Sequence, residues 1–324
     1  MIGFTTRIAT AVLVLLLALA AAAPAQAPAP APPVKCTVGA FIMSLYDLDA
    51  RDGSFGVDYW LWFTYTDTGI KPLETVEYIN TKTAGDSLAS VEDRNGTFYA
   101  CKKVKATVIH DWAVEAFPFD RQVLRIIVEE SNWESSRIQY VPDTAATNVS
   151  SDIALRGWKI DDVDIKVMNS PYDTTFGDPR GESEAVFTRA VISITLVREA
   201  TGMFFKLHGV LYIAMAVVVL ALFMKPADQV VFAGRVGLIV SMLFAAIINQ
   251  CVVEASVGET VRLSLSAKIH ILTFVAVFAA ILITFLSRRW HEHGQGDRAI
   301  MLDRVSALVL PMLYAVINVM LIFM

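Results

Sequence analysis

Hydrophobic and polar positions follow two different patterns along the chain, and the change comes near residue 198. Between residues 34 and 197, short segments alternate apolar and polar side chains, as at 55–65, 97–109, 123–128 and 185–197. Turn residues such as Asp52-Gly53 and Asn95-Gly96 separate these segments, roughly every eight to twelve residues. Because alternate side chains of a strand lie on opposite faces, this pattern predicts a β-sandwich and not strand–helix–strand units.

Four long apolar segments follow, at 203–224, 230–253, 265–286 and 305–324. At ~1.5 Å per helical residue, each is long enough to cross a hydrocarbon layer of ~30 Å. The two patterns together predict an immunoglobulin-like β-sandwich domain at 34–198 and a four-helix transmembrane domain at 199–324.

The first 27 residues have the pattern of a secretory signal peptide. Arg7 precedes an apolar run at 8–23, which leads to small residues ending in Ala25-Gln26-Ala27, the order typical of a cleaved leader. Residues 28–33 alternate Ala and Pro, which favours an extended spacer. We therefore expect a signal peptide at 1–27 and a spacer at 28–33, with an uncleaved anchor as the alternative.

The cationic residues near the apolar segments predict the orientation of the chain. If the sandwich is exported, the first span runs inward, and the following cations all fall on the cytoplasmic side: Lys225, Arg235, Arg288, Arg289, Arg298 and Arg304. This distribution satisfies the positive-inside rule. We expect a protein of the bacterial inner membrane, with the N-terminal domain and the C-terminus in the periplasm.

Composition and motifs exclude several classes of protein. Of the 324 residues, 55% are hydrophobic, too many for an ordinary soluble protein. The net charge is −5 and the basic residues form no long run, so we exclude nucleic-acid binding. The sequence has no zinc-protease or nucleophile-elbow motif, so we expect no enzyme, no cofactor and no metal. Cys36 and Cys101 lie in the exported domain, where a disulfide and two free thiols are both compatible with the sequence.

The second apolar segment is unusual because it contains Arg235, Ser241 and Glu254. Polar groups are costly against lipid, so this helix should face water or protein. Its small and apolar positions recur on one helical face, which comprises Gly237, Ser241, Phe244, Ile248 and Val252. In a ring of subunits this face would form a hydrophobic constriction at Phe244 and Ile248. In a monomer the same face would be packing, and the pattern alone leaves both readings open.

A motif at Phe117-Pro118-Phe119-Asp120-Arg121-Gln122, followed by the expected strand 123–128, resembles the signature loop of the pentameric ligand-gated ion channels, the Cys-loop receptor superfamily. His110 and Leu124 stand where animal members have the loop cysteines, so the chain resembles the prokaryotic type without the loop disulfide. The resemblance extends over nearly the whole mature chain, through segments 60–67 and 233–238 and Trp158 and Arg198.

The resemblance implies a homopentamer of identical subunits that binds a small-molecule agonist, conducts ions and contacts membrane lipid. Its agonist pocket would lie between subunits and draw on Trp60, Tyr78, Glu129, Glu130, Trp133, Tyr172 and Phe176. Aromatic faces beside carboxylates favour a cationic amine, and protons are the alternative agonist. The turn-rich hairpin 169–184 would be the mobile cap of this pocket.

The resemblance also implies a pore lined by Gly237, Ser241, Phe244, Ile248, Val252 and Glu254. Asp120 and Arg198 would couple the sandwich to the membrane domain, with Asp49 nearby. The ends of the pore helix disagree on selectivity: the segment around Arg235 resembles anion-selective members, whereas Glu254 favours cations, and we expect cations. Two rival hypotheses remain, a non-conducting periplasmic sensor anchored by four helices and a membrane enzyme.

Overall fold

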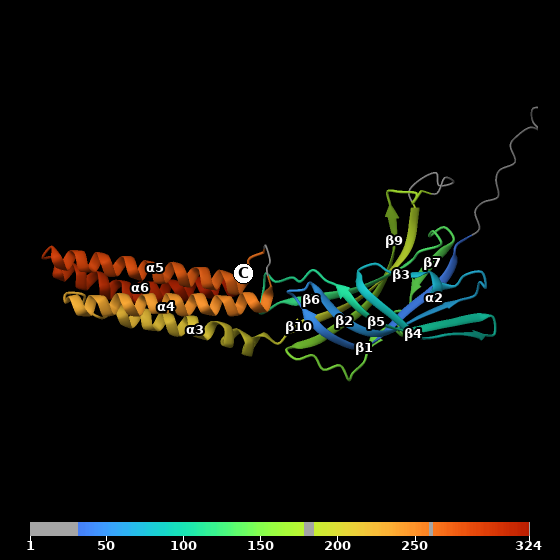
Figure 1. Cartoon of the computed structure of the whole chain (residues 1–324), viewed down its shortest axis with the longest axis horizontal. Coiled ribbons are helices and arrows are strands. Elements are labelled where there is room, and N and C mark those ends of the chain that lie inside the picture. The colour runs from blue at the N-terminus through green and yellow to red at the C-terminus, as the bar shows by residue number, and fades with distance from the viewer. Residues whose placement is uncertain (1–31, 178–184, 259–261, 324) are drawn as a thin grey trace, which may run out of the picture. The chain divides into compact units, whose positions relative to one another are not determined.

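The computed structural model describes residues 32–177, 185–258 and 262–323. The expected signal peptide, most of the spacer and the end of the hairpin 169–184 lie outside these residues. The described part consists of a β-sandwich and four long helices (Figure 1). The predicted fold class is therefore confirmed.

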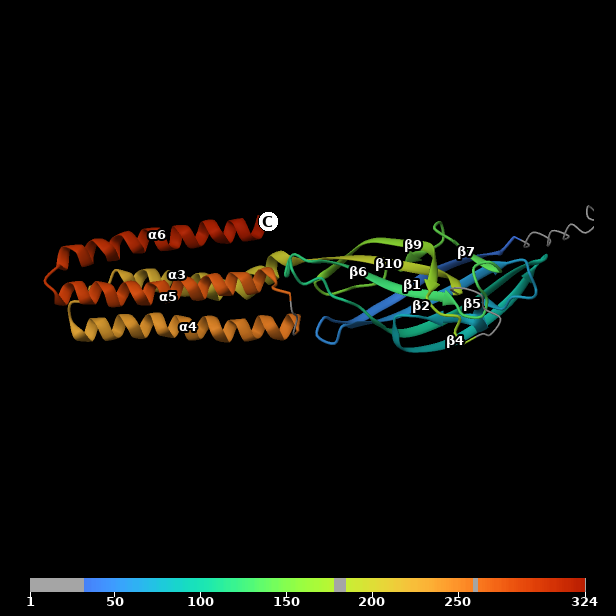
Figure 2. The ribbon, with the colours of Figure 1, turned by 90° about the horizontal axis from the view of Figure 1, so that it is seen from above.

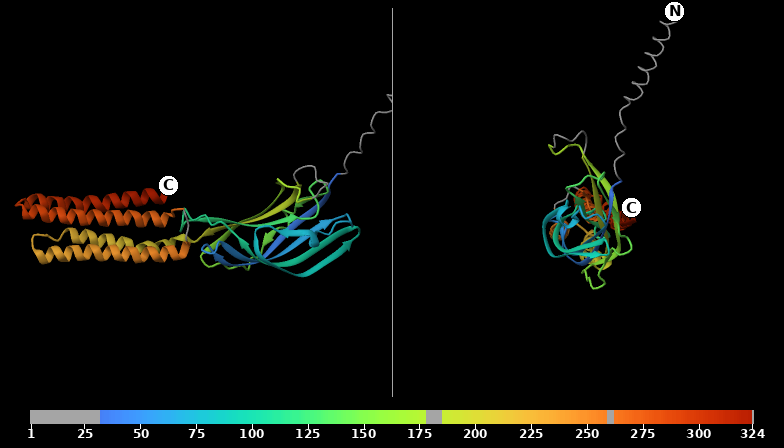
Figure 3. Two further views of the ribbon diagram at one scale, coloured as in Figure 1. Left: turned by 45° about the horizontal axis from the view of Figure 1, so that its top comes forward. Right: turned by 90° about the vertical axis from the view of Figure 1, so that its right-hand side faces the viewer.

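The sandwich has two sheets (Figure 3). In the six-stranded sheet the order is β4 (Thr81–Arg94), β5 (Thr97–Ile109), β2 (Ser54–Tyr65), β1 (Val34–Asp49) and β7 (Ile138–Pro142), with β8 (Asn148–Val149) beside β1. In the four-stranded sheet the order is β3 (Val76–Tyr78), β6 (Arg121–Glu130), β10 (Ala185–Arg198) and β9 (Trp158–Tyr172). A short helix, α2 (Pro72–Thr75), precedes β3.

Alternation along β2 shows how the sequence pattern creates the core. Tyr59, Leu61 and Phe63 are buried between the sheets, whereas Trp60 and Trp62 are half-buried on the opposite face. Each buried side chain of this size contributes roughly 1.5–3 kcal/mol relative to exposure. The same alternation sets the register of β2 between β1 and β5, because a slip by one residue would turn the whole core set outward.

The two cysteines of the sandwich are free thiols. Cys36 lies on β1 and Cys101 on β5, and β2 separates these two strands in the sheet. Cys36 is fully buried, and this burial raises the pKa of its thiol. The structure thus favours the free thiols of the two alternatives that the sequence leaves open.

The membrane-type helices are α3 (Ala200–Leu222), α4 (Gln229–Val257), α5 (Leu265–Glu292) and α6 (Gly296–Phe323). All four are long and apolar enough to cross a membrane. α5 and α6 extend well beyond the predicted spans, so most of the expected loop 287–304 is helical and only a short turn joins them. Polar residues in this segment end the apolar stretch, but the helix continues through them. Hydropathy alone cannot distinguish the end of an apolar stretch from the end of a helix.

The helices pack unequally. α4 contacts α3 and α5, and α6 also contacts α3 and α5, so Figure 2 shows α3 and α5 lying between α4 and α6. In the most apolar stretch of each helix, 44% of α3 and 39% of α5 are buried, but only 22% of α6 and 17% of α4. One side of α4 is therefore left uncovered within the chain.

Candidate functional site

A cavity of about 560 Å³ opens at one end of the four-stranded sheet. β3, β6 and β10 and the turns after β6 and β9 contribute its residues. Four carboxylates and three aromatic rings are among its lining residues, namely Glu77, Glu129, Glu130, Glu134, Tyr172, Phe176 and Phe187. The cavity therefore combines a surplus of negative charge with aromatic walls.

Glu129 fixes one wall of this cavity. Its Oε1 accepts a hydrogen bond of 2.5 Å from the Tyr172 hydroxyl, and its Oε2 accepts one of 2.7 Å from Arg189 Nε. Arg189 Nη2 also donates to the Tyr172 hydroxyl oxygen, at 3.0 Å. Burial, and then the hydrogen bond to Glu129, raise the pKa of Tyr172. The phenol is thus held protonated with its ring on the cavity.

Glu130 is the most buried carboxylate of the cavity, with no exposed surface. The Thr75 hydroxyl donates to its Oε2 at 2.7 Å, and the Asn132 backbone amide donates to its Oε1 at 3.1 Å. Burial nevertheless raises the pKa of Glu130, because hydrogen bonds from Thr75 and from the Asn132 and Trp133 backbone compensate only in part for lost hydration. This carboxyl binds a proton more readily than an exposed glutamate does.

The three aromatic rings of the cavity contact one another edge to face. The Tyr172 ring centre lies 5.3 Å from that of Phe176 and 6.0 Å from that of Phe187, and the last two are 6.1 Å apart. Phe176 is 65% exposed and has a positive φ of 53°. Its ring therefore has free surface to offer a ligand.

Three of the expected pocket residues are not among those that line this cavity. Trp60 is on the outer face of the six-stranded sheet, opposite Phe41 and Lys103 in register. Tyr78 donates a hydrogen bond of 2.7 Å to Asp86 Oδ1 instead of lining the cavity. Trp133 is 41% exposed in the loop after β6, beside the lining residues of that loop.

Several lining residues were missed from the sequence, among them Glu77, Glu134 and Phe187. Glu77 precedes Tyr78 on β3, and alternation along the strand puts these two side chains on opposite faces. Alternation therefore allows only one of the two to face the cavity, and it does not indicate which one. Arg189, which pairs with Glu129 across β10 and β6, had no local signal at all.

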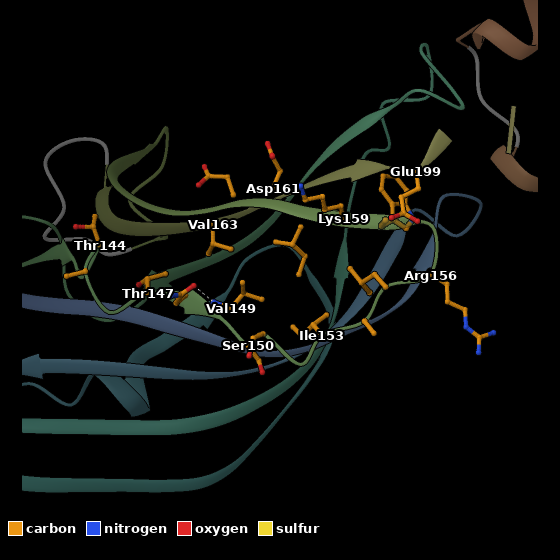
Figure 4. Close-up of a pocket in the computed structure, with 18 residues that line it drawn as sticks. Thr144, Thr147, Val149, Ser150, Ile153, Arg156, Lys159, Asp161, Val163 and Glu199 are labelled. Atoms are coloured by element: carbon orange, nitrogen blue, oxygen red, sulfur yellow. Dashed lines mark hydrogen bonds between the residues drawn. The ribbon is translucent and has the colours of Figure 1, made fainter. Parts of the chain in front are cut away.

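A second and larger cavity, of about 820 Å³, lies between the segment after β7 and strand β9 (Figure 4). Its walls include Val149, Ile153 and Trp158, and charges of both signs surround it. Figure 4 shows Arg156, Lys159, Asp161 and Glu199 dispersed around its edge. The lining of this cavity has neither a single sign of charge nor a cluster of hydrogen-bond donors.

The expected junction pair is in direct contact. Arg198 Nε and Nη2 donate to the two carboxylate oxygens of Asp120 at 2.6 and 3.0 Å. The guanidinium lies 3.9 Å from the centre of the Trp158 ring, and Gln122 Nε2 donates to Asp120 at 2.8 Å. The Asp120 side chain is 1% exposed. This is a buried, bidentate ion pair of the kind that fixes geometry strongly.

The signature loop that carries Asp120 also binds the beginning of α5. The backbone amide of Leu265 donates to the Glu115 carbonyl at 2.8 Å, and the Ser266 hydroxyl donates to the Phe117 carbonyl at 3.2 Å. Arg262 forms an ion pair of 2.9 Å with Glu115. The loop therefore connects the last strand of the sandwich to the third membrane helix.

The turn between β1 and β2 approaches the end of α4. At Gly258, which has a φ of +80°, an added Cβ would lie 2.7 Å from the Cα of Arg51, closer than real Cβ contacts permit. Asp49 instead accepts hydrogen bonds from the Arg51 and Asp52 amides. Asp49 thus belongs to the turn that lies beside the end of α4, and its role in coupling stays a prediction.

The expected pore stripe lies on the uncovered side of α4. Phe244, Ile248 and Val252 are 61%, 66% and 54% exposed. Gly237 and Ser241, the other members of the stripe, are also exposed, and so is Glu254, the further expected pore residue. Near the C-terminal end of α4, Glu254 accepts a hydrogen bond of 2.6 Å from Gln250 Nε2. The stripe therefore does not pack against other helices of the same chain. This argues against the alternative in which the pattern of the stripe serves packing in a monomer.

Arg235 lies on the opposite side of α4 and is fully buried. Its Nη2 donates to Asp303 Oδ1 on α6 at 2.7 Å. Further up α4, Asn249 also points into the bundle and forms an interhelical hydrogen bond of 3.0 Å with His270 Nε2. The polar residues of α4 thus divide between a face that binds neighbouring helices and the exposed stripe.

A β-sandwich followed by four helices able to cross a membrane is the architecture of the pentameric ligand-gated channel fold. No family model matches the chain. The chain is similar to a proton-gated ion channel of Gloeobacter violaceus, with 20% identity over 314 residues that cover 90% of this chain and 83% of the relative. The relative is an ion channel and not an enzyme, and the similarity spans both the sandwich and the helices.

Proposed function

We propose that the chain is one subunit of a homopentameric ligand-gated ion channel of the bacterial inner membrane, with the sandwich and the C-terminus in the periplasm. The observation that carries this proposal is the uncovered stripe of α4, which runs from Gly237 to Glu254. A helix with serine and glutamate on its free face is poorly suited to lipid. In a ring of subunits, the same face lines a water-filled pore.

The pocket between β6, β9 and β10 is the proposed ligand site. Its four carboxylates outnumber the single Arg189 that pairs with one of them, so it favours a cation. Stacking of an ammonium on the Tyr172 and Phe176 rings would add ~0.5–2 kcal/mol per ring. Trp60, on the outer face of the other sheet, is the residue that a neighbouring subunit would contribute.

A proton is the second candidate ligand, and a specific observation favours it. Burial raises the pKa of Glu130 within the same cavity, so mild acidification would neutralise this carboxyl first. The relative from Gloeobacter violaceus is itself named as proton-gated. Amine binding and protonation change the same charge cluster in the same direction, because each lowers its net negative charge.

The path from ligand to pore passes through the Asp120–Arg198 pair. β10 carries pocket residues near its beginning and Arg198 at its end, so movement of this strand displaces the guanidinium. Asp120 follows through its two hydrogen bonds, and the signature loop transmits the shift to Leu265 and Ser266 at the start of α5. The pair and the loop are the proposed coupling element.

Phe244 and Ile248 form the proposed gate. They are the bulky apolar members of the stripe, and a narrow ring of such side chains excludes water until the helices move apart. Glu254, near the outer end, would concentrate cations before this constriction. The proposed channel is therefore selective for small cations.

Recording from the purified protein in a planar bilayer tests this proposal. We expect currents upon addition of small primary or quaternary amines, or upon acidification of the sandwich side, and the two triggers are applied separately. Glu134→Gln and Tyr172→Phe should weaken the amine response, whereas Glu130→Gln should remove the acid response. Lys71→Gln, at an exposed surface pair, is the matched control.

A non-conducting sensor anchored by four helices is the alternative. It predicts ligand binding by the same pocket without any current, and its assembly need not be five-fold. A structure of the detergent-extracted assembly therefore completes the test: a monomer or dimer with α4 packed against lipid would contradict the channel proposal.

A further inference from the structure

α4 contains only two charged side chains, Arg235 and Glu254. They lie near opposite ends of the helix and have opposite sign, so they favour opposite ion selectivities if both reach the pore. Glu254 is exposed, whereas Arg235 is fully buried on the other side of the helix. The orientation of Arg235 thus decides which charge permeant ions meet.

Three neighbouring elements hold the guanidinium inside the bundle. Its Nη1 donates to the Met224 carbonyl after α3 at 2.9 Å, and its Nε donates to the Thr284 hydroxyl on α5 at 3.0 Å. Its Nη2 donates to Asp303 Oδ1 on α6 at 2.7 Å. Each nitrogen of the guanidinium has one partner, and only Asp303 carries a compensating charge.

Asp303 is itself fixed for this role. Its side chain is 9% exposed, and its Oδ2 accepts a hydrogen bond of 2.7 Å from the Ser287 hydroxyl on α5. Both carboxylate oxygens therefore bind groups within the bundle. The neighbouring residue Arg304 is exposed, so the backbone of α6 directs one ionisable side chain inward and the next outward.

Without Asp303, the burial of Arg235 becomes unfavourable. Leaving one member of a buried ion pair without its partner is strongly destabilising, because the remaining charge is buried without compensation. The long arginine stem allows the charged group to move to water instead. Gly237, two residues along α4, lies on the side of the helix opposite to Arg235. An unpaired guanidinium would therefore have to leave the bundle before it could reach the stripe.

We propose that Asp303 on α6 is a positioning residue for ion selectivity: by pairing with Arg235, it holds the guanidinium out of the pore and leaves Glu254 as the charge of α4 that ions meet. This inference rests on the proposed function, in which α4 lines the pore. It assigns a selectivity role to a residue on α6, a helix that packs mainly against α5 and α3.

Permeability ratios in asymmetric potassium chloride test the inference on the full-length reconstituted protein. Asp303→Asn should lower the cation-to-anion ratio severalfold, because it removes the charge that retains Arg235. Asp303→Glu should restore the parent ratio. Asp297→Asn, an exposed acid in the first turn of the same helix, is the matched control and should leave the ratio unchanged.

The double variant Arg235→Gln with Asp303→Asn separates charge from structure. It removes both charges, and buried ion pairs are often replaced by neutral groups at little cost, so its ratio should return to that of the parent. If the double variant keeps the low ratio of Asp303→Asn, Arg235 is not the cause and the inference fails. An unchanged ratio in assembled Asp303→Asn channels would also overturn it.

Two further outcomes have a defined meaning. If channels composed wholly of Asp303→Asn subunits fail to assemble, co-expression with the parent gives mixed channels, whose ratio should fall with the share of variant subunits; a constant ratio would contradict the inference. If the assembled parent protein carries no current under any ligand, the proposed function fails and this inference with it. A cation-selective parent with unchanged variants overturns the inference alone.

Discussion

Arg198 binds Asp120 through two hydrogen bonds, of 2.6 and 3.0 Å, although the two residues are 78 positions apart in the sequence. One ends the last strand of the sandwich, and the other belongs to the loop that contacts the beginning of α5. The pair therefore links the last strand of the sandwich to the loop that contacts α5, which is why we propose it as the coupling element.

We expect Arg198→Ala and Asp120→Ala to assemble and yet respond poorly to ligand. Each substitution removes one partner of the proposed coupling pair. Coupling free energies of 1–3 kcal/mol correspond to a fall in ligand potency of about 5- to 150-fold. Concentration–response curves in bilayers measure this shift. Arg121→Ala, which breaks the exposed neighbouring pair with Asp161, should respond normally.

Two results would change this interpretation. Normal gating in both variants would show that the ion pair has no role in coupling. Loss of all assembled protein would instead show that the pair is needed for the fold and say nothing for coupling.

We expect Phe244→Ser and Ile248→Ser to produce channels that leak without ligand. Both residues are exposed on the stripe, and a hydroxyl in an apolar constriction favours water entry into the closed pore. Basal current divided by maximal current is the measurement. Leu238→Ser changes an exposed apolar residue on another face of α4 and should not leak. Parent-like behaviour of both stripe variants would show that the wrong face was assigned to the pore.

We expect Glu254→Gln to lower the preference for cations by about tenfold, because a ring of carboxylates raises the local cation concentration by at least this factor. The reversal potential in asymmetric salt reports the change. Glu254→Asp keeps the charge and should remain cation-selective. A chloride-selective parent would refute the expected selectivity, and an unaltered preference in Glu254→Gln would move the filter to another residue.

We expect Glu130→Gln to remove a pH-dependent loss of stability in the sandwich. Burial raises the pKa of Glu130 in the folded chain, so the folded state retains its proton where the unfolded state has lost it. The free energy of unfolding therefore falls as the pH rises from the ordinary glutamate value of 4.5 through the raised folded value. Unfolding midpoints between acid and neutral pH test this difference. Glu134→Gln, an exposed acid of the same cavity, should keep the slope of the parent.

The sequence was sufficient for the fold wherever the signal is local. Alternation along β2 and the length of the apolar segments are properties of consecutive residues, so the sandwich and the four helices could be predicted. β4 had no such signal, because nearly all its side chains are exposed; it is a strand because β5 provides hydrogen-bond partners along its edge. The polar continuation of α5 to Glu292 was also missed, because its polar residues give no local hydrophobic signal.

The candidate sites depend on residues far apart in the chain, and local sequence patterns do not predict which of these residues meet. Asp120 and Arg198 were brought together only by resemblance to a family. Glu129 pairs with Arg189 at a separation of 60 positions, and Arg235 pairs with Asp303 at a separation of 68. Such pairs follow from the topology of the sheets and bundle, which periodicity does not encode. The roles assigned to the pocket, the junction and the stripe stay predictions.

The uncovered side of α4 also determines what the stability of this protein means. A single chain in a bilayer would expose Ser241 and Glu254 to hydrocarbon, and association removes that cost. Folding of the membrane half is then linked to association by mass action, so dilution should weaken it as it weakens any obligate oligomer. We therefore expect the unfolding midpoint to rise with the protein-to-lipid ratio, and a stability quoted for one chain alone would have no defined value.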